Sequence, residues 1–283
     1  MSLTNSTTPT CEDIAIILSL REGSSRFIKR KWAHEGERDD DLAKLLDRFS
    51  NRPEGIATLD EFGSKYLPAV VDRFIEAKFE LPLPPTPPPG AFHNGYFSIL
   101  SRLSHPPLNY FAKYLRSKHP IASPGKKLGR VIAERLAEIT QLHPDMTLAP
   151  SYAQSLFRIL DVLAFILLIF EGDQEPITVD VKMTLLVLVE DCKVSQNERL
   201  RTVSASLSNL LTTSFKHSPE RRKWVMTTRG QNRCGLPTCN ITTGLKACAR
   251  CLTVCYCSPE HQRAHWRSKI SLPHKACCFS TVY

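Results

Sequence analysis

Cysteine and histidine residues that could bind a metal ion are concentrated between residues 234 and 283. The chain has ten cysteines, and only Cys11 and Cys192 lie outside this stretch. The candidate donors form four pairs in chain order, namely Cys234 and Cys239, Cys248 and Cys251, Cys257 and His261, and His274 and Cys278. A short turn or one helical turn joins each pair, so both donors can reach one ion. Tetrahedral Zn²⁺ takes four donors, and the four pairs therefore predict two zinc ions.

Other uses of cysteine fit this sequence less well. The first ten residues lack the basic and apolar regions of a signal peptide, so we expect a reducing compartment in which thiols do not form disulfides. Redox catalysis by a Cys-x-x-Cys pair is typical of a βαβ context, which is not found around Cys248 and Cys251. Sites with four protein ligands are closed to substrate, so we expect structural zinc and no metal catalysis.

The segment 234–278 resembles a MYND-type zinc finger. The resemblance rests on the runs Val254-Cys-Tyr-Cys-Ser-Pro-Glu-His-Gln-Arg-Ala-His-Trp266 and His274-Lys-Ala-Cys-Cys278. It implies interleaved ligation, in which the first and third pairs share one ion and the second and fourth pairs share the other. The first ion is then held by Cys234, Cys239, Cys257 and His261, and the second by Cys248, Cys251, His274 and Cys278.

The sequence departs from the family pattern in three ways. His261 stands where the family has a cysteine, and a histidine nitrogen is also a competent zinc donor. Residues 267–273 separate Trp266 from His274 where the family has two residues, and this insertion could loosen the second site or present a new loop. Three further donors are present, Cys255, His265 and Cys277. The choices between His261 and His265, and between Cys277 and Cys278, therefore stay open, although Cys278 preserves the family spacing.

The resemblance also implies a function. MYND-type fingers are protein-interaction modules that read short proline-containing peptides, and the family's peptide surface corresponds here to Gln262 and Trp266. We therefore expect a non-enzymatic protein whose finger recruits a protein partner.

Three alternative functions fit the sequence less well. SET/MYND-type lysine methyltransferases place the finger between β-rich SET halves, whereas the region before residue 234 has helical patterning. A nucleic-acid-associated transcriptional regulator would suit the basic charge, but no recognition helix with base-reading positions lies between the ligands. A RING-type ubiquitin ligase is disfavoured by the order of the ligands. RING domains have their first histidine between the third and fourth cysteine positions, and this chain does not.

Composition and charge indicate the general type of protein. The chain is 42% hydrophobic and 23% charged, which is typical of a globular protein long enough to bury a core. Its formal net charge of +9 suits an acidic partner without identifying one. The most apolar run, 159–170, is shorter than the roughly 20 residues that a bilayer requires, so we expect no membrane span. We expect an intracellular protein, with the basic clusters at 26–31 and 221–223 favouring the nucleus over the cytoplasm.

The elements that surround these features are predicted to be helices. Apolar residues recur at helical spacing over nine stretches, and strand-type alternation is scarce. The stretches are 12–21, 41–49, 59–78, 95–103, 110–118, 127–142, 152–170, 179–192 and 197–213. Thr58 and Glu61 have the spacing of a capping box and predict a helix start at Thr58. The two most apolar stretches, 152–170 and 179–192, are expected to pack as an antiparallel pair.

The sequence as a whole predicts a mainly α protein in three parts. Residues 1–213 form an all-α domain, an irregular helical bundle, with a proline-rich linker at 81–90 where helix cannot continue. Residues 214–233 form a basic linker. Residues 234–278 form the small two-zinc finger, which needs its metal to fold. The helical part carries no phosphate-binding loop or recognised catalytic motif, which agrees with the expectation of no enzymatic activity.

Overall fold

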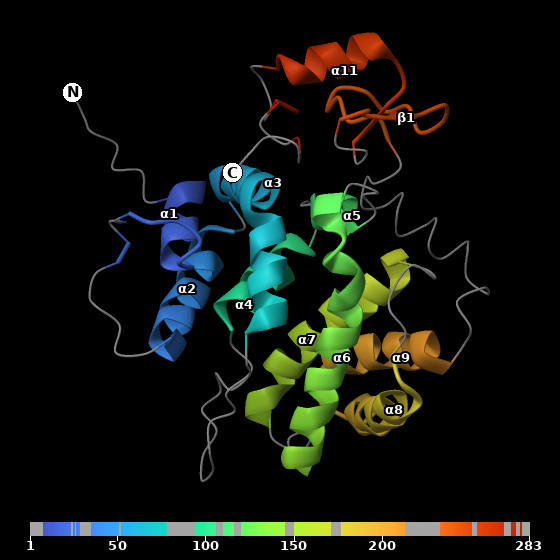
Figure 1. The fold of residues 1–283 in the computed structure, drawn as a ribbon. Helices are drawn as coiled ribbons and strands as arrows, with labels where there is room; N and C mark the ends of the chain where they lie inside the picture. The colour runs from blue at the N-terminus through green and yellow to red at the C-terminus, as the bar shows by residue number, and fades with distance from the viewer. Residues whose placement is uncertain are drawn as a thin grey trace.

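A computed structural model describes residues 8–23, 25, 27–28, 35–50, 52–77, 94–105, 110–115, 120–144, 150–170, 177–212, 233–250, 254–268, 273–275 and 278. Within these residues the protein is mainly α, as predicted, and its one sheet has two short strands (Figure 1). Several predicted features lie outside the described residues, namely the proline-rich linker at 81–90, residues 214–232 of the basic linker, the basic cluster at 221–223, most of the cluster at 26–31, and the side chains of Cys251 and Cys277.

The described helical part contains one α-helix for each of the nine predicted stretches, and one 3-10 helix that the periodicity does not predict. Its helices are α1 (Cys11–Ile17), α2 (Glu35–Phe49), α3 (Pro53–Glu76), α4 (Gly95–Leu103), α5 (Tyr110–Leu115), the 3-10 helix η1 (Pro120–Ala122), α6 (Gly125–Leu142), α7 (Pro150–Phe170), α8 (Val179–Lys193) and α9 (Glu198–Thr212). The finger contains β1 (Lys246–Ala247), β2 (Cys255–Tyr256) and α11 (Pro259–Trp266). None of the described helices is both long enough and apolar enough to span a membrane.

The helix starts follow local capping chemistry. Thr10 caps α1 in a capping box, in which its hydroxyl accepts from the Asp13 N–H at 3.1 Å and the Asp13 carboxylate accepts from the Thr10 N–H at 2.9 Å. The prediction that the third helix begins at Thr58 is wrong, because α3 begins at Pro53 and Thr58 lies inside it. A proline at the first helical position lacks the N–H that would otherwise need a cap, and its φ is already helical.

Helix α6 joins the two halves of the bundle. It packs against α3 in the first half and against α7 and α8 in the second half, and Figure 1 shows α3 and α6 side by side. The Arg135 guanidinium of α6 donates to the carbonyl oxygens of Phe74, Ile75 and Ala77 at the end of α3, at 2.6, 3.1 and 2.5 Å. The last carbonyls of a helix generally lack N–H donors from their own helix, so Arg135 caps the end of α3 from the neighbouring helix.

Helix α9, not α7, is the principal neighbour of α8. Both α7 and α8 pack extensively against α9, whereas α7 and α8 make no contact of comparable extent. The prediction that 152–170 and 179–192 form an antiparallel pair is therefore wrong. Residues Leu185, Leu188, Val189 and Cys192 of α8 are buried, while Val179, Met183 and Val187 are exposed.

Candidate metal centre

The two strands place their following cysteines at opposite ends of a small sheet. β1 and β2 are antiparallel, with Lys246 opposite Tyr256 and Ala247 opposite Cys255. Cys248 follows β1 directly and Cys257 follows β2 directly. Because antiparallel strands run in opposite directions, these two cysteines are carried away from each other. The register therefore assigns Cys248 and Cys257 to different clusters.

A capped helix start brings Cys257 and His261 together. The Ser258 hydroxyl accepts from the His261 N–H at 3.3 Å, and Pro259 occupies the first turn of α11. The helix therefore begins immediately after Cys257, which places the two donors one turn apart. Cys257 Sγ and His261 Nδ1 are 3.1 Å apart.

A tight turn supplies the other two donors of this first cluster. The Cys239 N–H donates to the Leu236 carbonyl at 2.9 Å, and the Cys234 N–H donates to the Ile241 carbonyl at 2.8 Å. The Gly235 N–H donates to the Cys255 carbonyl at 2.7 Å, which ties the turn to β2. A Cβ atom at Gly235 would lie 2.4 Å from Val254 Cγ1, so glycine permits this close approach.

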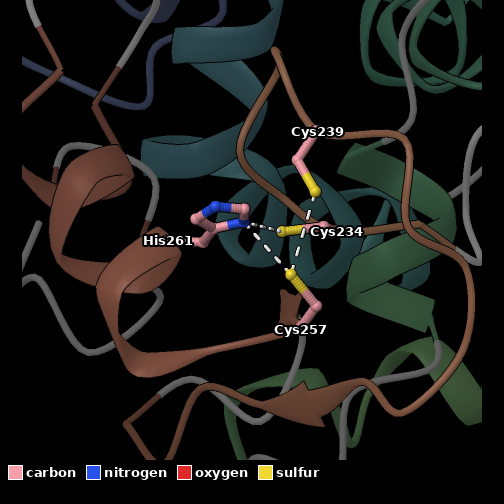
Figure 2. Close-up of side chains that lie close together, drawn as sticks. All are labelled: Cys234, Cys239, Cys257 and His261. Carbon is pink, nitrogen blue, oxygen red and sulfur yellow. Dashed lines mark hydrogen bonds between the residues drawn. The ribbon is translucent and has the colours of Figure 1, made fainter.

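The first cluster fits tetrahedral zinc. The donor atoms of Cys234, Cys239, Cys257 and His261 all lie within 4.8 Å of one another and converge on one point (Figure 2). Cys239 Sγ and Cys257 Sγ are 3.8 Å apart, and Cys234 Sγ and His261 Nδ1 are 3.7 Å apart. Tetrahedral Zn–S and Zn–N bonds of ordinary length place two sulfurs about 3.8 Å apart and a sulfur and a nitrogen about 3.6 Å apart, which these two pairs match. The Cys257–His261 pair is closer, at 3.1 Å, and would open when the ion binds. Three sulfurs and one imidazole nitrogen are also a donor set that zinc prefers.

The second cluster contains three of the four predicted donors. The donor atoms of Cys248, His274 and Cys278 lie within 4.8 Å of one another, and all three residues are buried. Burial lowers the pKa of the His274 imidazole, but hydrogen bonds with the Cys248 and Cys278 thiols outweigh it and raise the pKa above 6.5. The fourth predicted donor, Cys251, and the alternative donor Cys277 lie outside the described residues. The residues present fit a zinc ion that has one further donor.

The extra histidine has a different role from the two clustered histidines. His265 is buried, belongs to neither cluster, and its Nδ1 lies 2.9 Å from the Tyr256 hydroxyl. Its ring stacks on His274 with centroids 5.8 Å apart, and its carbonyl accepts from the His274 N–H at 3.0 Å. His265 thus holds His274 in place, despite the insertion at 267–273. Cys255 lies in β2 and also belongs to neither cluster.

The two predicted peptide-binding residues lie one turn apart on α11. Trp266 is half-buried, its ring meets His274 edge-on at 5.6 Å between centroids, and the Arg250 guanidinium lies 5.9 Å from the indole centroid. The Gln262 amide nitrogen lies 3.4 Å from Cys248 Sγ. We call Arg250, Gln262 and Trp266 the Trp266 face. The sequence alone did not indicate a role for Arg250 or Tyr256. Arg250 lies between Cys248 and Cys251, and Tyr256 directly precedes Cys257.

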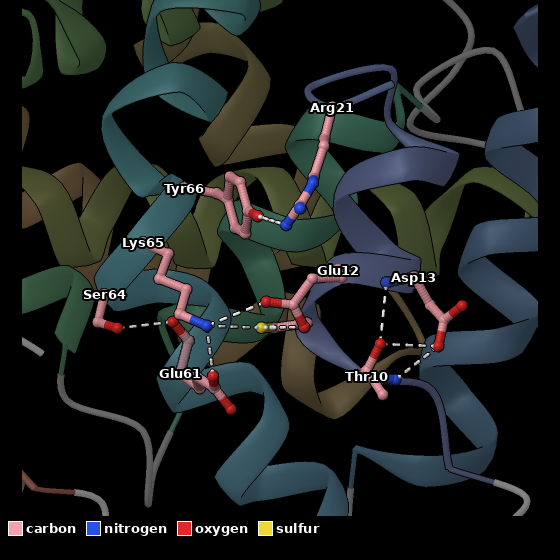
Figure 3. Close-up of polar contacts among 9 residues, drawn as sticks. Thr10, Glu12, Asp13, Arg21, Glu61, Ser64, Lys65 and Tyr66 are labelled. Atoms are coloured by element: carbon pink, nitrogen blue, oxygen red, sulfur yellow. Dashed lines mark hydrogen bonds and ion pairs between the residues drawn. The ribbon is translucent and has the colours of Figure 1, made fainter. Parts of the chain in front are cut away.

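A third group of possible donors is an ion-pair cluster and not a metal centre. Cys11, Glu12 and Glu61 lie close together, but the Lys65 ammonium lies between the two carboxylates, at 3.0 Å from Glu12 and 2.5 Å from Glu61 (Figure 3). Lys65 Nζ also lies 3.5 Å from Cys11 Sγ, and burial raises the pKa of this thiol. The Lys65 cation already pairs with both carboxylates, and a protonated thiol is a poor metal ligand.

Comparison with known proteins identifies the C-terminal part. Residues 232–278 match the family model of the MYND finger, so this part of the chain is a MYND finger, as its resemblance predicted. Both Cys/His clusters of the finger lie within the matched residues and could hold the zinc that such fingers bind. No curated protein and no solved structure matches the chain.

Proposed function

From the MYND finger at 232–278 we propose that this protein is a non-enzymatic interaction protein, which binds a short proline-containing peptide of a partner protein on the Trp266 face. The observation that carries the proposal is the position of Trp266. Its half-buried indole is supported from one side by His274, so it offers a fixed aromatic surface. Proline rings pack well on such surfaces, and an extended proline-rich peptide loses little conformational entropy on binding.

Two structural zinc ions hold this surface in place. One ion is bound by Cys234, Cys239, Cys257 and His261, and the other by Cys248, Cys251, His274 and Cys278. The distances in the first cluster and the burial of the second support this assignment. A finger of this size buries too little apolar surface to fold alone, and each structural zinc contributes on the order of 10 kcal/mol of folding free energy. His274 supports Trp266 directly, so the second ion orients the peptide surface.

The charge of the finger favours a peptide that is neutral or acidic. Arg233, Lys246, Arg250, Arg267 and Lys275 are exposed, whereas the exposed Glu260 is paired with Arg263 at 2.7 Å. Basic charge alone would also suit nucleic acid. However, α11 has only eight residues, and it commits His261 to the first cluster and His265 to the Tyr256 hydroxyl. This leaves little of the helix to read bases, which supports the peptide proposal.

Two further parts of the proposal rest on broader features. Enzymes of the SET/MYND type carry β-rich halves around the finger, whereas every described element before residue 233 is helical; this supports a role without catalysis. Zinc thiolates persist where thiols stay reduced, which supports an intracellular location. The basic clusters at 26–31 and 221–223 favour the nucleus over the cytoplasm.

The test is peptide binding by the zinc-loaded full chain. A panel of proline-containing peptides is titrated by fluorescence anisotropy against the wild type, Trp266→Ala and the control Arg263→Gln. We expect at least one peptide to bind, and Trp266→Ala to weaken binding at least tenfold while zinc content stays at two ions per chain. Arg263→Gln should bind like the wild type. No binding by any peptide, or equal binding by Trp266→Ala, would overturn the proposal; tight binding of a nucleic-acid duplex instead would favour the transcriptional alternative.

A further inference from the structure

Gln262 contacts the second metal cluster although its helix supplies a donor to the first. Its neighbour in the chain, His261, belongs to the first cluster. The Gln262 side chain is half-buried, and its Nε2 lies 3.4 Å from Sγ of Cys248 in the second cluster. α11 therefore reaches both clusters through two consecutive residues.

The chemistry of Cys248 fixes which end of the amide faces it. A zinc-bound thiolate can only accept hydrogen bonds, so the amide N–H group must point to the sulfur and the Oε1 atom must point away. Cys248 is 1% exposed, so water contributes little to the solvation of its charge. Its own backbone N–H donates to the Val254 carbonyl at 2.7 Å and cannot replace the side-chain donor.

The charge of the second centre makes this donor important. Three thiolates and one neutral histidine on Zn²⁺ leave one net negative charge in a buried site. A buried charge is costly unless hydrogen bonds from the protein replace those of water. Groups that donate to first-sphere ligands also fix the ligand orientation, and their removal typically costs about 10–100-fold in metal affinity.

We infer that Gln262 is a positioning residue of the second zinc centre, where its amide N–H holds the Cys248 thiolate and ties this centre to the helix that supplies His261 to the first. The inference rests on the proposed function, because it requires two bound ions. It also gives Gln262 a role beyond the peptide contact that the family resemblance implies. The Oε1 atom and the second N–H of the amide are left for a peptide, so a change at Gln262 disturbs the metal centre as well as the peptide surface.

The experiment uses the full chain loaded with ¹¹³Cd, whose NMR resonance reports each centre separately. Gln262→Leu has similar volume and no donor, Gln262→Glu replaces the donor with negative charge, and Arg263→Leu is the control on the next residue of α11. Cys239→Ser removes the first-centre resonance and thereby assigns the other. Release of metal to a chelator is then timed for each centre.

We expect two resonances in the wild type. Gln262→Leu should shift the second-centre resonance and speed its metal loss about tenfold or more, while the first centre is unchanged. Gln262→Glu should have a larger effect in the same direction, and Arg263→Leu should have none. Unchanged second-centre behaviour in Gln262→Leu, or equal loss from both centres, would overturn the inference alone. A wild-type chain that binds fewer than two ions would overturn the proposed function as well.

Discussion

Two cysteines that are close in the chain have different environments in the finger. Cys257 lies just after β2 and is a member of the first cluster, whereas Cys255 lies within β2 and belongs to neither cluster. We therefore expect Cys257→Ser to bind one zinc ion per chain and Cys255→Ser to bind two, because serine is a poor substitute for a zinc thiolate. Elemental analysis of the purified variants measures this directly. Two ions in Cys257→Ser would place the first centre on other residues.

The choice between His261 and His265 shows what the sequence alone could not determine. Both histidines follow Cys257 at multiples of four residues, so both lie on the same face of α11. The spacing predicts that one of them joins Cys257, but only the position of Tyr256 on the neighbouring strand decides which. Tyr256 takes His265 as its hydrogen-bond partner, and the His261 imidazole is the one that faces Cys234.

The ion pairs of Lys65 with Glu12 and Glu61 make the stability of the helical part depend on pH. Partial burial raises the pKa of Glu12, but hydrogen bonds from the Cys11 thiol and the Lys65 ammonium outweigh it and bring the pKa below its ordinary 4.5. Burial likewise lowers the pKa of Lys65, and its contacts with Glu61 and Glu12 raise it above the ordinary 10.5. These ion pairs therefore stabilise the folded state fully between pH 4.5 and pH 10.5. Their contribution is lost as pH falls through the folded pKa of Glu12 or rises through the folded pKa of Lys65.

We expect Lys65→Met to lower the free energy of unfolding by about 1 kcal/mol at neutral pH. The effect is small because both side chains of the Lys65–Glu12 pair are about one-third exposed (34% and 38%). At a second, acidic pH below 4.5 the difference from the wild type should shrink, because it is lost as pH falls through the folded pKa of Glu12. Urea denaturation at the two pH values measures it. Lys193→Met removes a more exposed pair with Glu190 and should change stability less; a pH-independent loss in Lys65→Met would rule out the ion pair as its cause.

At the scale of elements, helices could be predicted well and their partners poorly. Periodicity locates each helix, because an apolar stripe needs only local spacing. The start of α3 was misplaced because Thr58 and Glu61 match a capping pattern, whereas Pro53 was already able to begin the helix. The neighbour of α8 was misassigned for another reason. α8 is apolar on nearly every side, so its sequence does not reveal which face is buried.

The two faces of α8 give a test of this packing. Leu185 and Leu188 are fully buried, whereas Met183 and Val187 are 57% and 61% exposed. We expect Leu188→Ala to cost about 2–5 kcal/mol of stability, because it leaves a cavity in the core. Met183→Lys on the same helix should change stability by no more than about 0.5 kcal/mol. Thermal or urea denaturation compares the two variants, and a large loss in Met183→Lys would mean that this face is covered.

At the scale of the whole molecule, we expect the helical bundle and the finger to be stabilised by different forces. Side chains such as Phe62, Phe74, Phe111 and Tyr114 are fully buried in the helical bundle, whose stability comes from apolar burial. The finger has a two-stranded sheet and one short helix around clustered thiols and imidazoles, and we expect its stability to come from metal ligation. Among the described elements, no extensive contact joins the finger to the bundle.

This difference predicts how the full chain responds to loss of metal. Excess chelator should remove both ions and unfold the finger, with a loss of finger amide protection in hydrogen exchange, while the bundle stays folded. Far-UV circular dichroism should change little, because α11 has 8 residues whereas α3 alone has 24. Cys248→Ala should reproduce the effect on the finger without chelator, since it breaks the second centre. A large, cooperative loss of helicity on chelation would contradict the prediction, because it would mean that the bundle needs the folded finger for its own stability.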